Sequence, residues 1–197
     1  GKRMLERIYS VLVVNSSNSF TPFISSLFPG NKFYPVKVVD SALLARRALL
    51  FRQFDIVVIN SPLVDDSGLS LSLEIGKNNL TSVLLLSPSN LYSEVEAKLS
   101  NSGVFSLKKP VSIQTLEIAK KWIITSSDKI KLMQEEKVKV EEKMEEIKLV
   151  NRAKWILIED MKMSEKEAQN FILKEAMDKS ITKKEEATII INTYRPI

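Results

Sequence analysis

The stretch Asp55-Ile56-Val57-Val58-Ile59-Asn60 is the clearest guide to the fold of this 197-residue chain. Four consecutive β-branched apolar residues between polar ones are typical of a strand buried on both faces of a parallel sheet. Similar runs lie on either side, and together they predict five strands, at 8–14, 34–39, 55–59, 82–86 and 104–107. Helical patterns separate them, at 20–27, 41–52, 69–78 and 91–99. This alternation predicts a doubly wound α/β domain with a five-stranded parallel sheet.

A different pattern begins at Ser112, which is placed to cap a long helix starting at Ile113. No proline or glycine then follows until Pro196. Apolar residues recur at alternating spacings of three and four, as in a coiled-coil seam. The predicted seam consists of Ile130, Met133, Lys137, Val140, Met144, Ile147 and Asn151. We expect it to form a parallel homodimer; the alternative is one solvated helix with a weak apolar stripe.

Two capping boxes divide the end of the chain into short helices. Ser164 stands three residues before Glu167, and Thr182 three residues before Glu185, the spacing of reciprocal caps. They predict three all-α segments, at about 149–162, 165–178 and 183–193, that suit a small packing unit. The sequence thus predicts an α/β domain at 1–124, a coiled-coil linker helix at 125–148 and a three-helix domain at 149–197.

Composition excludes several classes of function. The chain has no histidine and no cysteine, which removes thiol nucleophiles, histidine bases and the usual zinc or haem ligands. The absence of cysteine is compatible with a cytosolic protein, and we expect a cytoplasmic protein that is not an enzyme and has no cofactor and no metal. Its longest apolar runs fall far short of the ~20 residues of a membrane helix. The net charge of +5 lies in residues 1–124, while residues 125–197 hold 15 basic and 15 acidic residues, so charge supports nucleic-acid binding only weakly.

Residues 7–124 resemble the receiver domain of response regulators. Five segments carry the resemblance, namely three strands, a glycine and a lysine-proline pair: 11–14, 55–59, 84–87, Gly68 and Lys109-Pro110. In the family, the first strand leads into an acidic pair and the third ends at the aspartate that is phosphorylated. Gly68 stands eight residues beyond that aspartate position, as the glycine of the family does. The resemblance implies a flavodoxin-like fold and a signalling domain that belongs to two-component regulation.

The residues that carry phosphorylation in receivers are replaced here. The matching positions hold Asn15 and Ser16 for the acidic pair, Asn60 for the phosphoacceptor, Ser87 for the hydroxyl residue and Lys109 for the lysine. An amide is a poor nucleophile, and Mg²⁺ prefers carboxylate ligands. We expect a pseudo-receiver that is controlled, if at all, by a small ligand or a partner such as a sensor protein. Asp65 and Asp66, in the next loop, are expected to be solvated turn residues.

Residues 128–194 resemble the ANTAR module of transcription antiterminators. The resemblance rests on Arg152-Ala153-Lys154-Trp155-Ile156-Leu157-Ile158, continued by Ser164-Glu165-x-Glu167-Ala168, Phe171-Ile172, Ala176-Met177 and Ala187 with Ile190. Trp155 stands where the family has glycine, and Ile158 where it has methionine. The resemblance implies binding of RNA hairpin loops in nascent leader transcripts, with dimerisation letting two modules engage paired hairpins.

Cations and rings of this module are the candidates for RNA contact, because loops are held through phosphates and by stacking. They are Arg152, Lys154, Trp155, Lys174, Lys179, Lys183 and Lys184. For each lysine the alternative is a solvated helix face, with Lys154 favoured for RNA because it matches the family motif. Trp155 belongs either to the core or to the RNA surface, Phe171 is expected in the core, and Tyr194 is expected either to contact RNA or to pack on the first of the three helices.

Three functions compete at this point. The first is RNA-binding antitermination, and the second is a partner-controlled protein-interaction adapter in a two-component-like system. The third, DNA binding, is disfavoured because no helix-turn-helix with a basic recognition helix is visible.

Overall fold

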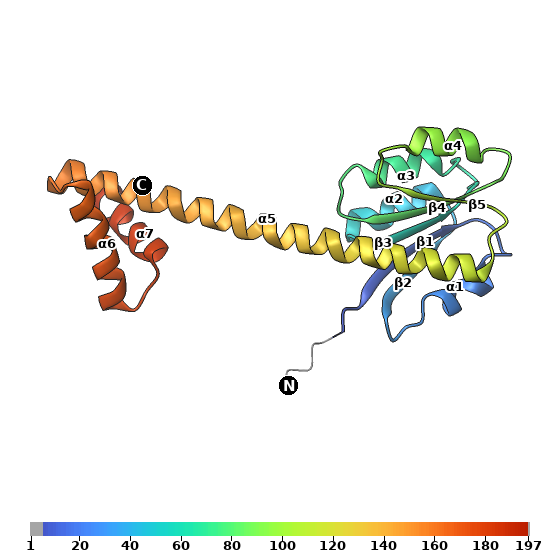
Figure 1. Cartoon of the computed structure of the whole chain (residues 1–197), viewed down its shortest axis with the longest axis horizontal. Coiled ribbons are helices and arrows are strands. Elements are labelled where there is room, and N and C mark those ends of the chain that lie inside the picture. The colour runs from blue at the N-terminus through green and yellow to red at the C-terminus, as the bar shows by residue number, and fades with distance from the viewer. Residues whose placement is uncertain (1–5, 197) are drawn as a thin grey trace. The chain divides into compact units, whose positions relative to one another are not determined.

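The computed structural model describes residues 6–196, in which five parallel strands alternate with four helices and three further helices follow (Figure 1). The strands are β1 (Tyr9–Asn15), β2 (Phe33–Val39), β3 (Ile56–Asn60), β4 (Ser82–Ser87) and β5 (Phe105–Lys108). The helices are α1 (Thr21–Leu27), α2 (Ala42–Phe51), α3 (Leu69–Gly76), α4 (Tyr92–Leu99), α5 (Ile113–Met161), α6 (Glu165–Lys179) and α7 (Lys183–Tyr194). The strand order is β2-β1-β3-β4-β5, which confirms the predicted flavodoxin-like α/β fold.

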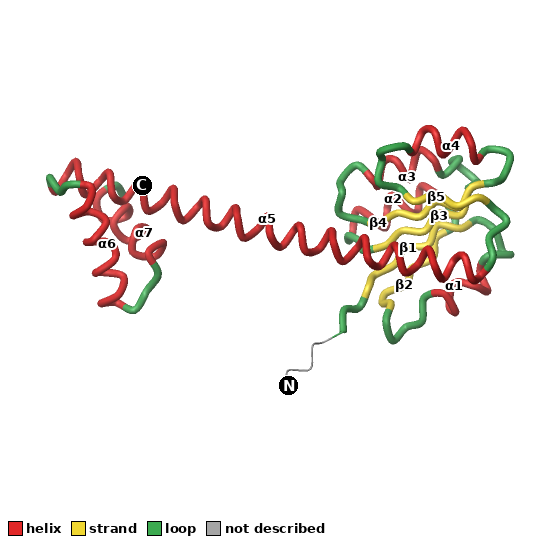
Figure 2. Tube along the Cα trace, viewed as in Figure 1, coloured by secondary structure: helices red, strands yellow, loops and turns green. Residues whose placement is uncertain are grey.

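Helices pack on both faces of the sheet through two apolar layers, so the central strands are buried on both faces. In β3 the side chains of Val57 and Ile59 pack beneath α2, α3 and α4, whereas those of Ile56 and Val58 pack beneath α1 and α5. Figure 2 shows the strands, in yellow, between these two helix layers. Such double burial explains why the strands read as continuous apolar runs rather than as an alternating pattern.

The register of the sheet places the polar strand ends together. The last residues of β1 and β3, Asn15 and Asn60, are paired across the parallel ladder. The chain reverses its winding direction between these two strands, since β2 lies outside β1 and β4 lies outside β3. In open α/β sheets, ligands bind outside the carboxyl ends of the strands at such a switch point.

Helix α5 is a single element of 49 residues. As predicted, Ser112 caps its start, with the Thr115 N–H donating to Ser112 Oγ at 3.1 Å. Its first turns pack on the sheet through Leu116, Ala119 and Ile123. The segment 149–162, expected as a separate short helix, is instead the end of α5, because no glycine or proline interrupts the chain before it.

The end of α5 packs with α6 and α7 around a small apolar core. Its centre is formed by Ala153, Leu157, Ala168, Ile172 and Ala187, all of which are buried. Both predicted capping boxes are present, from Ser164 to Glu167 and from Thr182 to Glu185. The three helices therefore form the predicted packing unit around alanine, leucine and isoleucine side chains.

The chain divides into two compact units, the first ending at Leu132 and the second beginning at Met133. This division falls within α5 and inside the predicted linker, residues 125–148. Since α5 passes residues 124 and 148 without a break, the predicted domain boundaries at those positions stay predictions. Across residues 6–196, no helix combines the length and the apolar character needed to cross a membrane.

Candidate functional site

Three of the five predicted residues of the altered receiver site meet at the carboxyl edge of the sheet. Asn60 Nδ2 donates to Asn15 Oδ1 at 2.9 Å, and Lys109 Nζ donates to Asn60 Oδ1 at 2.9 Å. Lys109 Nζ also donates to the backbone oxygen of Ser61. Both asparagines are buried. The strand ends thus hold a chain of neutral amides that finishes at one cation.

The hydroxyl groups of the other two residues have different surroundings. Ser16 Oγ donates to the backbone oxygen of Asp40 at 2.5 Å and accepts from the Val64 N–H at 3.2 Å, so it is engaged by neighbouring loops. Ser87 Oγ is buried and has no hydrogen-bond partner among residues 6–196. Neither residue joins the Asn15–Asn60–Lys109 chain.

The chemistry of this edge differs from that of a carboxylate site. Burial lowers the pKa of the Lys109 ammonium from its ordinary value, and the acceptors that it reaches are an amide and a backbone carbonyl. An amide oxygen is a poor nucleophile toward phosphorus. Within the described residues, no group of three or more acidic side chains is gathered in a way that could hold a metal ion. What remains is a partly buried cation able to attract an anion.

Asp65 is an exposed loop residue, as expected, whereas only 12% of the Asp66 side chain is exposed, and both carboxylates make hydrogen bonds that the sequence did not predict. Asp65 accepts from the N–H groups of Ala42 and Leu43, at 2.8 and 3.0 Å, and these two hydrogen bonds lower the pKa of its carboxyl. Asp66 accepts from the Gly68 N–H at 2.7 Å. Gly68 has a φ of 86°, a left-handed conformation that glycine adopts without strain. Both carboxylates therefore fix the loops beside β3.

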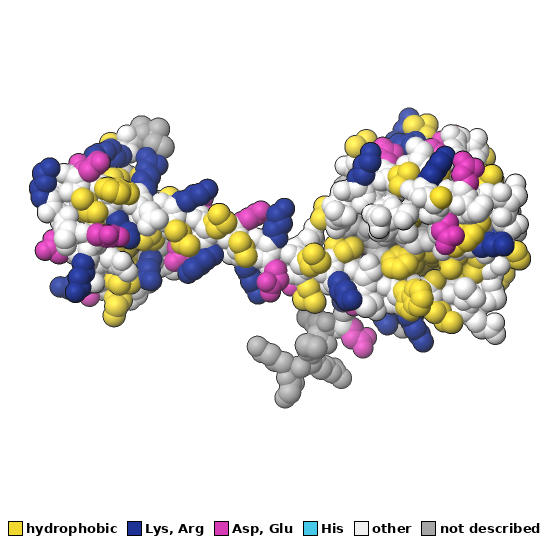
Figure 3. Space-filling model, turned by 45° about the horizontal axis from the view of Figure 1, so that its top comes forward, with side chains coloured by type: hydrophobic (Ala, Val, Ile, Leu, Met, Phe, Trp, Pro, Cys, Tyr) yellow, Lys and Arg dark blue, Asp and Glu magenta, His cyan; other side chains and the backbone are white. Residues whose placement is uncertain are grey.

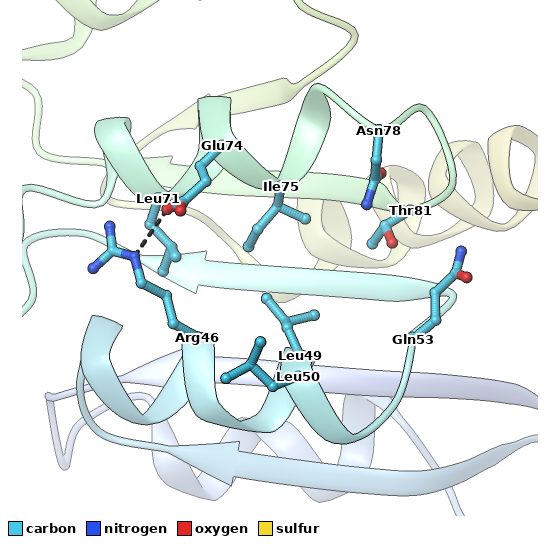
Figure 4. A pocket seen from close by; sticks show the side chains of 9 residues that line it. All are labelled: Arg46, Leu49, Leu50, Gln53, Leu71, Glu74, Ile75, Asn78 and Thr81. Carbon is cyan, nitrogen blue, oxygen red and sulfur yellow. Dashed lines mark hydrogen bonds and ion pairs between the residues drawn. The ribbon is translucent and has the colours of Figure 1, made fainter.

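A hollow of about 530 Å³ lies between α2 and α3 (Figure 4). Leucine and isoleucine side chains, including Leu49, Leu71 and Ile75, form its apolar part. At one end Arg46 Nε donates to Glu74 Oε2 at 2.8 Å, so the two charges neutralise each other. This hollow therefore offers apolar surface, and the two charged side chains that line it already pair with each other.

In the second unit, two of the predicted RNA-contacting lysines are already engaged. Lys154 Nζ lies 3.6 Å from Glu165 Oε1, and only 16% of its side chain is exposed. Lys179 Nζ donates to Glu186 Oε2 at 2.9 Å and lies 3.4 Å from Glu175 Oε2. The hydrogen bond to Glu186, above all, raises the pKa of Lys179. Both lysines thus stabilise the contacts between helices in this arrangement.

The remaining predicted residues lie at the surface. Trp155 is 62% exposed, so its ring is not part of the core, and Arg152 and Lys174 are exposed as well. Phe171 packs against the core, as expected. The Tyr194 hydroxyl lies 3.6 Å from Met161 Sδ at the end of α5, in agreement with packing on that helix.

Lys183 and Lys184 lie beside α5 at the start of α7. With Lys139 and Lys143 they line a hollow of about 620 Å³, which Glu142, Glu146 and Thr182 also border. We call these four lysines the α5–α7 lysine cluster. Sequence reasoning missed Lys139 and Lys143, because only the folding of α7 against α5 brings them to the other pair. Arg152 is not part of the cluster: it follows Lys143 by nine residues, roughly two and a half helical turns, and so faces the opposite side of α5.

The surface of this unit carries both signs of charge, as Figure 3 shows by the dark blue and magenta side chains on its visible face. The α5–α7 lysine cluster is accordingly a local concentration of cations within a unit that is close to neutral.

The predicted seam lies on α5 as a stripe of exposed apolar side chains. Met133, Val140, Met144 and Ile147 are 71%, 56%, 54% and 50% exposed, although they recur at the spacing of core residues. Every residue from 131 to 145 is exposed in the single chain. The stripe is therefore an apolar surface that no element within residues 6–196 covers.

Each of the two units is similar to known proteins. Residues 138–191 match the ANTAR domain. Over 139 residues, the chain is 27% identical to the transcriptional regulatory protein PdtaR of Mycobacterium tuberculosis, a match that covers 71% of this chain and 68% of that protein.

Solved structures of receiver domains share the fold of the first unit. The signal receiver domain of an HD domain-containing protein from Pseudomonas fluorescens Pf-5 has a TM-score of 0.56 and 22% identity, and the match covers 64% of this chain and 93% of that one. A response regulator receiver domain from Clostridium thermocellum has a TM-score of 0.53 and 21% identity, over 64% of this chain and 99% of that one. The chain therefore resembles an ANTAR response regulator: its C-terminal region matches the ANTAR domain, and its first unit has the fold of receiver domains.

Proposed function

We propose that this protein is an RNA-binding transcription antitermination regulator that acts on hairpins in nascent leader mRNA. The ANTAR match over residues 138–191 is the observation that carries the proposal, since ANTAR domains are RNA-binding regulators. The protein acts in the cytoplasm, where transcripts emerge, and it acts by binding rather than by catalysis. By holding hairpins in the leader, it prevents an overlapping terminator from forming.

The proposed RNA surface combines cations with an exposed ring. The α5–α7 lysine cluster supplies cations for phosphates, and Arg152 supplies another on the opposite side of α5. Trp155 supplies a ring for stacking on an unpaired base. Lys174 adds another exposed cation. Lys154 and Lys179 contribute chiefly by holding the helices in place, and they reach RNA only if their ion pairs open.

The proposed active form is a parallel homodimer. Pairing along Met133, Val140, Met144 and Ile147 would remove exposed apolar area from water, the usual driving force of coiled coils. Two ANTAR domains would then be held together, so that two hairpins of one leader bind as a unit. Such linkage raises affinity through effective concentration.

The receiver-like domain is proposed not to accept phosphate on an aspartate. Asn60 stands at the phosphoacceptor position and bonds to Asn15 and Lys109, and Ser16 is held by neighbouring loops. Control of the protein would then come from a ligand or a partner protein that binds this domain.

The decisive experiment is a gel shift with the leader RNA upstream of the protein's own operon. We expect a complex with a leader that carries two hairpins, and affinity at least tenfold lower when one hairpin is deleted. Lys183→Gln with Lys184→Gln should weaken the complex. Lys129→Gln with Lys131→Gln, which removes the same charge outside the ANTAR match, should not. A folded dimer that shifts no tandem-hairpin leader would refute the proposal.

A protein-interaction adapter is the second candidate, favoured by the apolar surface of α2. Leu50 and Phe51 are almost fully exposed there, next to the hollow of Figure 4. An adapter would bind its protein partner equally well after nuclease treatment. Equal function of the chain in the absence of any leader RNA would favour this alternative.

A further inference from the structure

A third hollow, in the first unit, opens at the carboxyl edge of the sheet, directly over Asn60 and Lys109. Its volume is about 300 Å³, near the lower end of the range for small-molecule sites. We call it the strand-end pocket. It lies beside β1 and β3, where the winding of the sheet reverses, the place where open α/β sheets bind ligands.

The walls of the strand-end pocket are mostly apolar. Phe20 and Phe23 contribute from the start of α1, Leu86 from β4, Val111 from the loop after β5, and Leu116 from α5. Phe20, Leu86 and Leu116 are buried, so the wall is supported by the core rather than by mobile surface side chains. An apolar wall of this kind favours the body of an organic molecule over a hydrated inorganic ion.

One cation lies at the floor. An ammonium has three N–H donors, and Lys109 uses two for Asn60 Oδ1 and the backbone oxygen of Ser61. Both acceptors are neutral, and among the described residues no carboxylate is recorded within ion-pair distance of Lys109. The charge of Lys109 is thus only partly compensated, which its lowered pKa also indicates.

We propose that the strand-end pocket binds a small organic monocarboxylate. Its carboxylate accepts from Lys109 Nζ, and its aliphatic or aromatic body lies between Phe20, Phe23 and Leu116. One negative charge matches the one cation, whereas a phosphate dianion would leave a charge against apolar walls. This inference rests on the part of the proposed function in which the site takes up no phosphate, and it does not depend on RNA binding.

The test is a titration of the full chain with benzoate, phenylacetate and hexanoate, each compared with its primary amide, followed by ¹H–¹⁵N NMR and calorimetry. We expect saturable shifts confined to residues around the strand-end pocket, and at least tenfold weaker binding of each amide. Lys109→Met, which keeps the apolar stem, should lower carboxylate affinity at least tenfold. Lys108→Met, at the exposed neighbouring lysine, should leave it within twofold.

Two results would overturn the inference: no saturable shift at the pocket with any of the three carboxylates, or equal affinity for acid and amide. If Lys109→Met does not fold, the acid–amide comparison on the unmodified chain decides alone. A gel shift on the same sample separates the two proposals, because RNA binding without carboxylate binding refutes only this one.

Discussion

The exchange of carboxylates for amides at Asn15 and Asn60 changes what the strand ends can hold. Two carboxylates and a phosphoacceptor would gather negative charge that demands a divalent cation. Two amides instead satisfy each other through one hydrogen bond and leave Lys109 as the only charge in that hydrogen-bonded chain. A change of a few atoms therefore converts a metal-dependent site into one that favours an anion.

Restoring the carboxylates should restore the chemistry. With acetyl phosphate and Mg²⁺, we expect the unmodified chain to gain no phosphate by intact mass. The triple variant Asn15→Asp, Ser16→Asp, Asn60→Asp should gain one, because it has both a nucleophile and metal ligands. Asn60→Asp alone is the control, with a nucleophile but no restored acidic pair, and should react far more slowly. Phosphate on the unmodified chain, mapped to the strand ends, would contradict the prediction.

For single residues, the sequence predicted the position in the fold better than the ion-pair partners of the side chain. Asn15, Asn60 and Lys109 could be placed together because parallel strands end at one edge of a sheet. The ion pairs of Lys154 with Glu165 and of Lys179 with Glu186 join different helices, so no local pattern reveals them. For the same reason, the sequence indicated only Lys183 and Lys184 of the α5–α7 lysine cluster.

Among the elements, α5 is joined to the sheet by a polar network as well as by apolar packing. The Tyr9 hydroxyl, on β1, donates to Asp128 Oδ1 of α5 at 2.8 Å. Arg7 donates to the same oxygen at 2.5 Å and to Asp55 Oδ1 at 3.2 Å. Burial, followed by the hydrogen bond to Asp128, raises the pKa of Tyr9 to about 12. The network thus fixes α5 beyond the residues that touch the sheet.

This network predicts a specific loss of stability in alkali. The folded state favours the neutral phenol, so its contribution is fully present below the unfolded pKa of about 10 and is lost as pH rises toward 12. Urea unfolding followed by circular dichroism should show Tyr9→Phe less stable at pH 8 by roughly 1.5–3 kcal/mol. Its stability should then decline less between pH 10 and 12 than that of the unmodified chain. Tyr34→Phe, at an exposed ring, is the control, and an equal effect there would contradict the assignment.

The helix boundaries show which elements local sequence can determine. Ser112, Ser164 and Thr182 were identified as caps because a cap acts within its own helical turn. The continuity of α5 through residues 149–161 was not predicted, although it needs only the absence of a breaker. A separate helix starting near residue 149 was expected together with the two capped helices, but no glycine or proline interrupts α5 at that point.

At the scale of the whole molecule, the predicted seam would join two chains into a functional dimer. Lys137 and Asn151 interrupt it with polar side chains, which lower the stability of a coiled coil but restrict its register and oligomeric state. Ile130 is partly buried in the single chain, so the exposed stripe proper begins at Met133. A dimer held by so short a stripe would be of modest stability, and RNA with two hairpins would strengthen it by linkage.

The seam can be tested by comparing substitutions at its positions with substitutions elsewhere on the surface of α5. Val140→Lys with Ile147→Lys places charges at two seam positions, and we expect monomers by light scattering together with at least tenfold weaker binding of a tandem-hairpin leader. Leu132→Lys with Val138→Lys adds the same charge to exposed apolar residues of α5 outside the seam, and should leave both dimer and complex intact. Because added lysines by themselves favour RNA, a loss of binding in the first pair cannot be electrostatic. Dimers that survive the seam substitutions would show that the chain pairs through another surface.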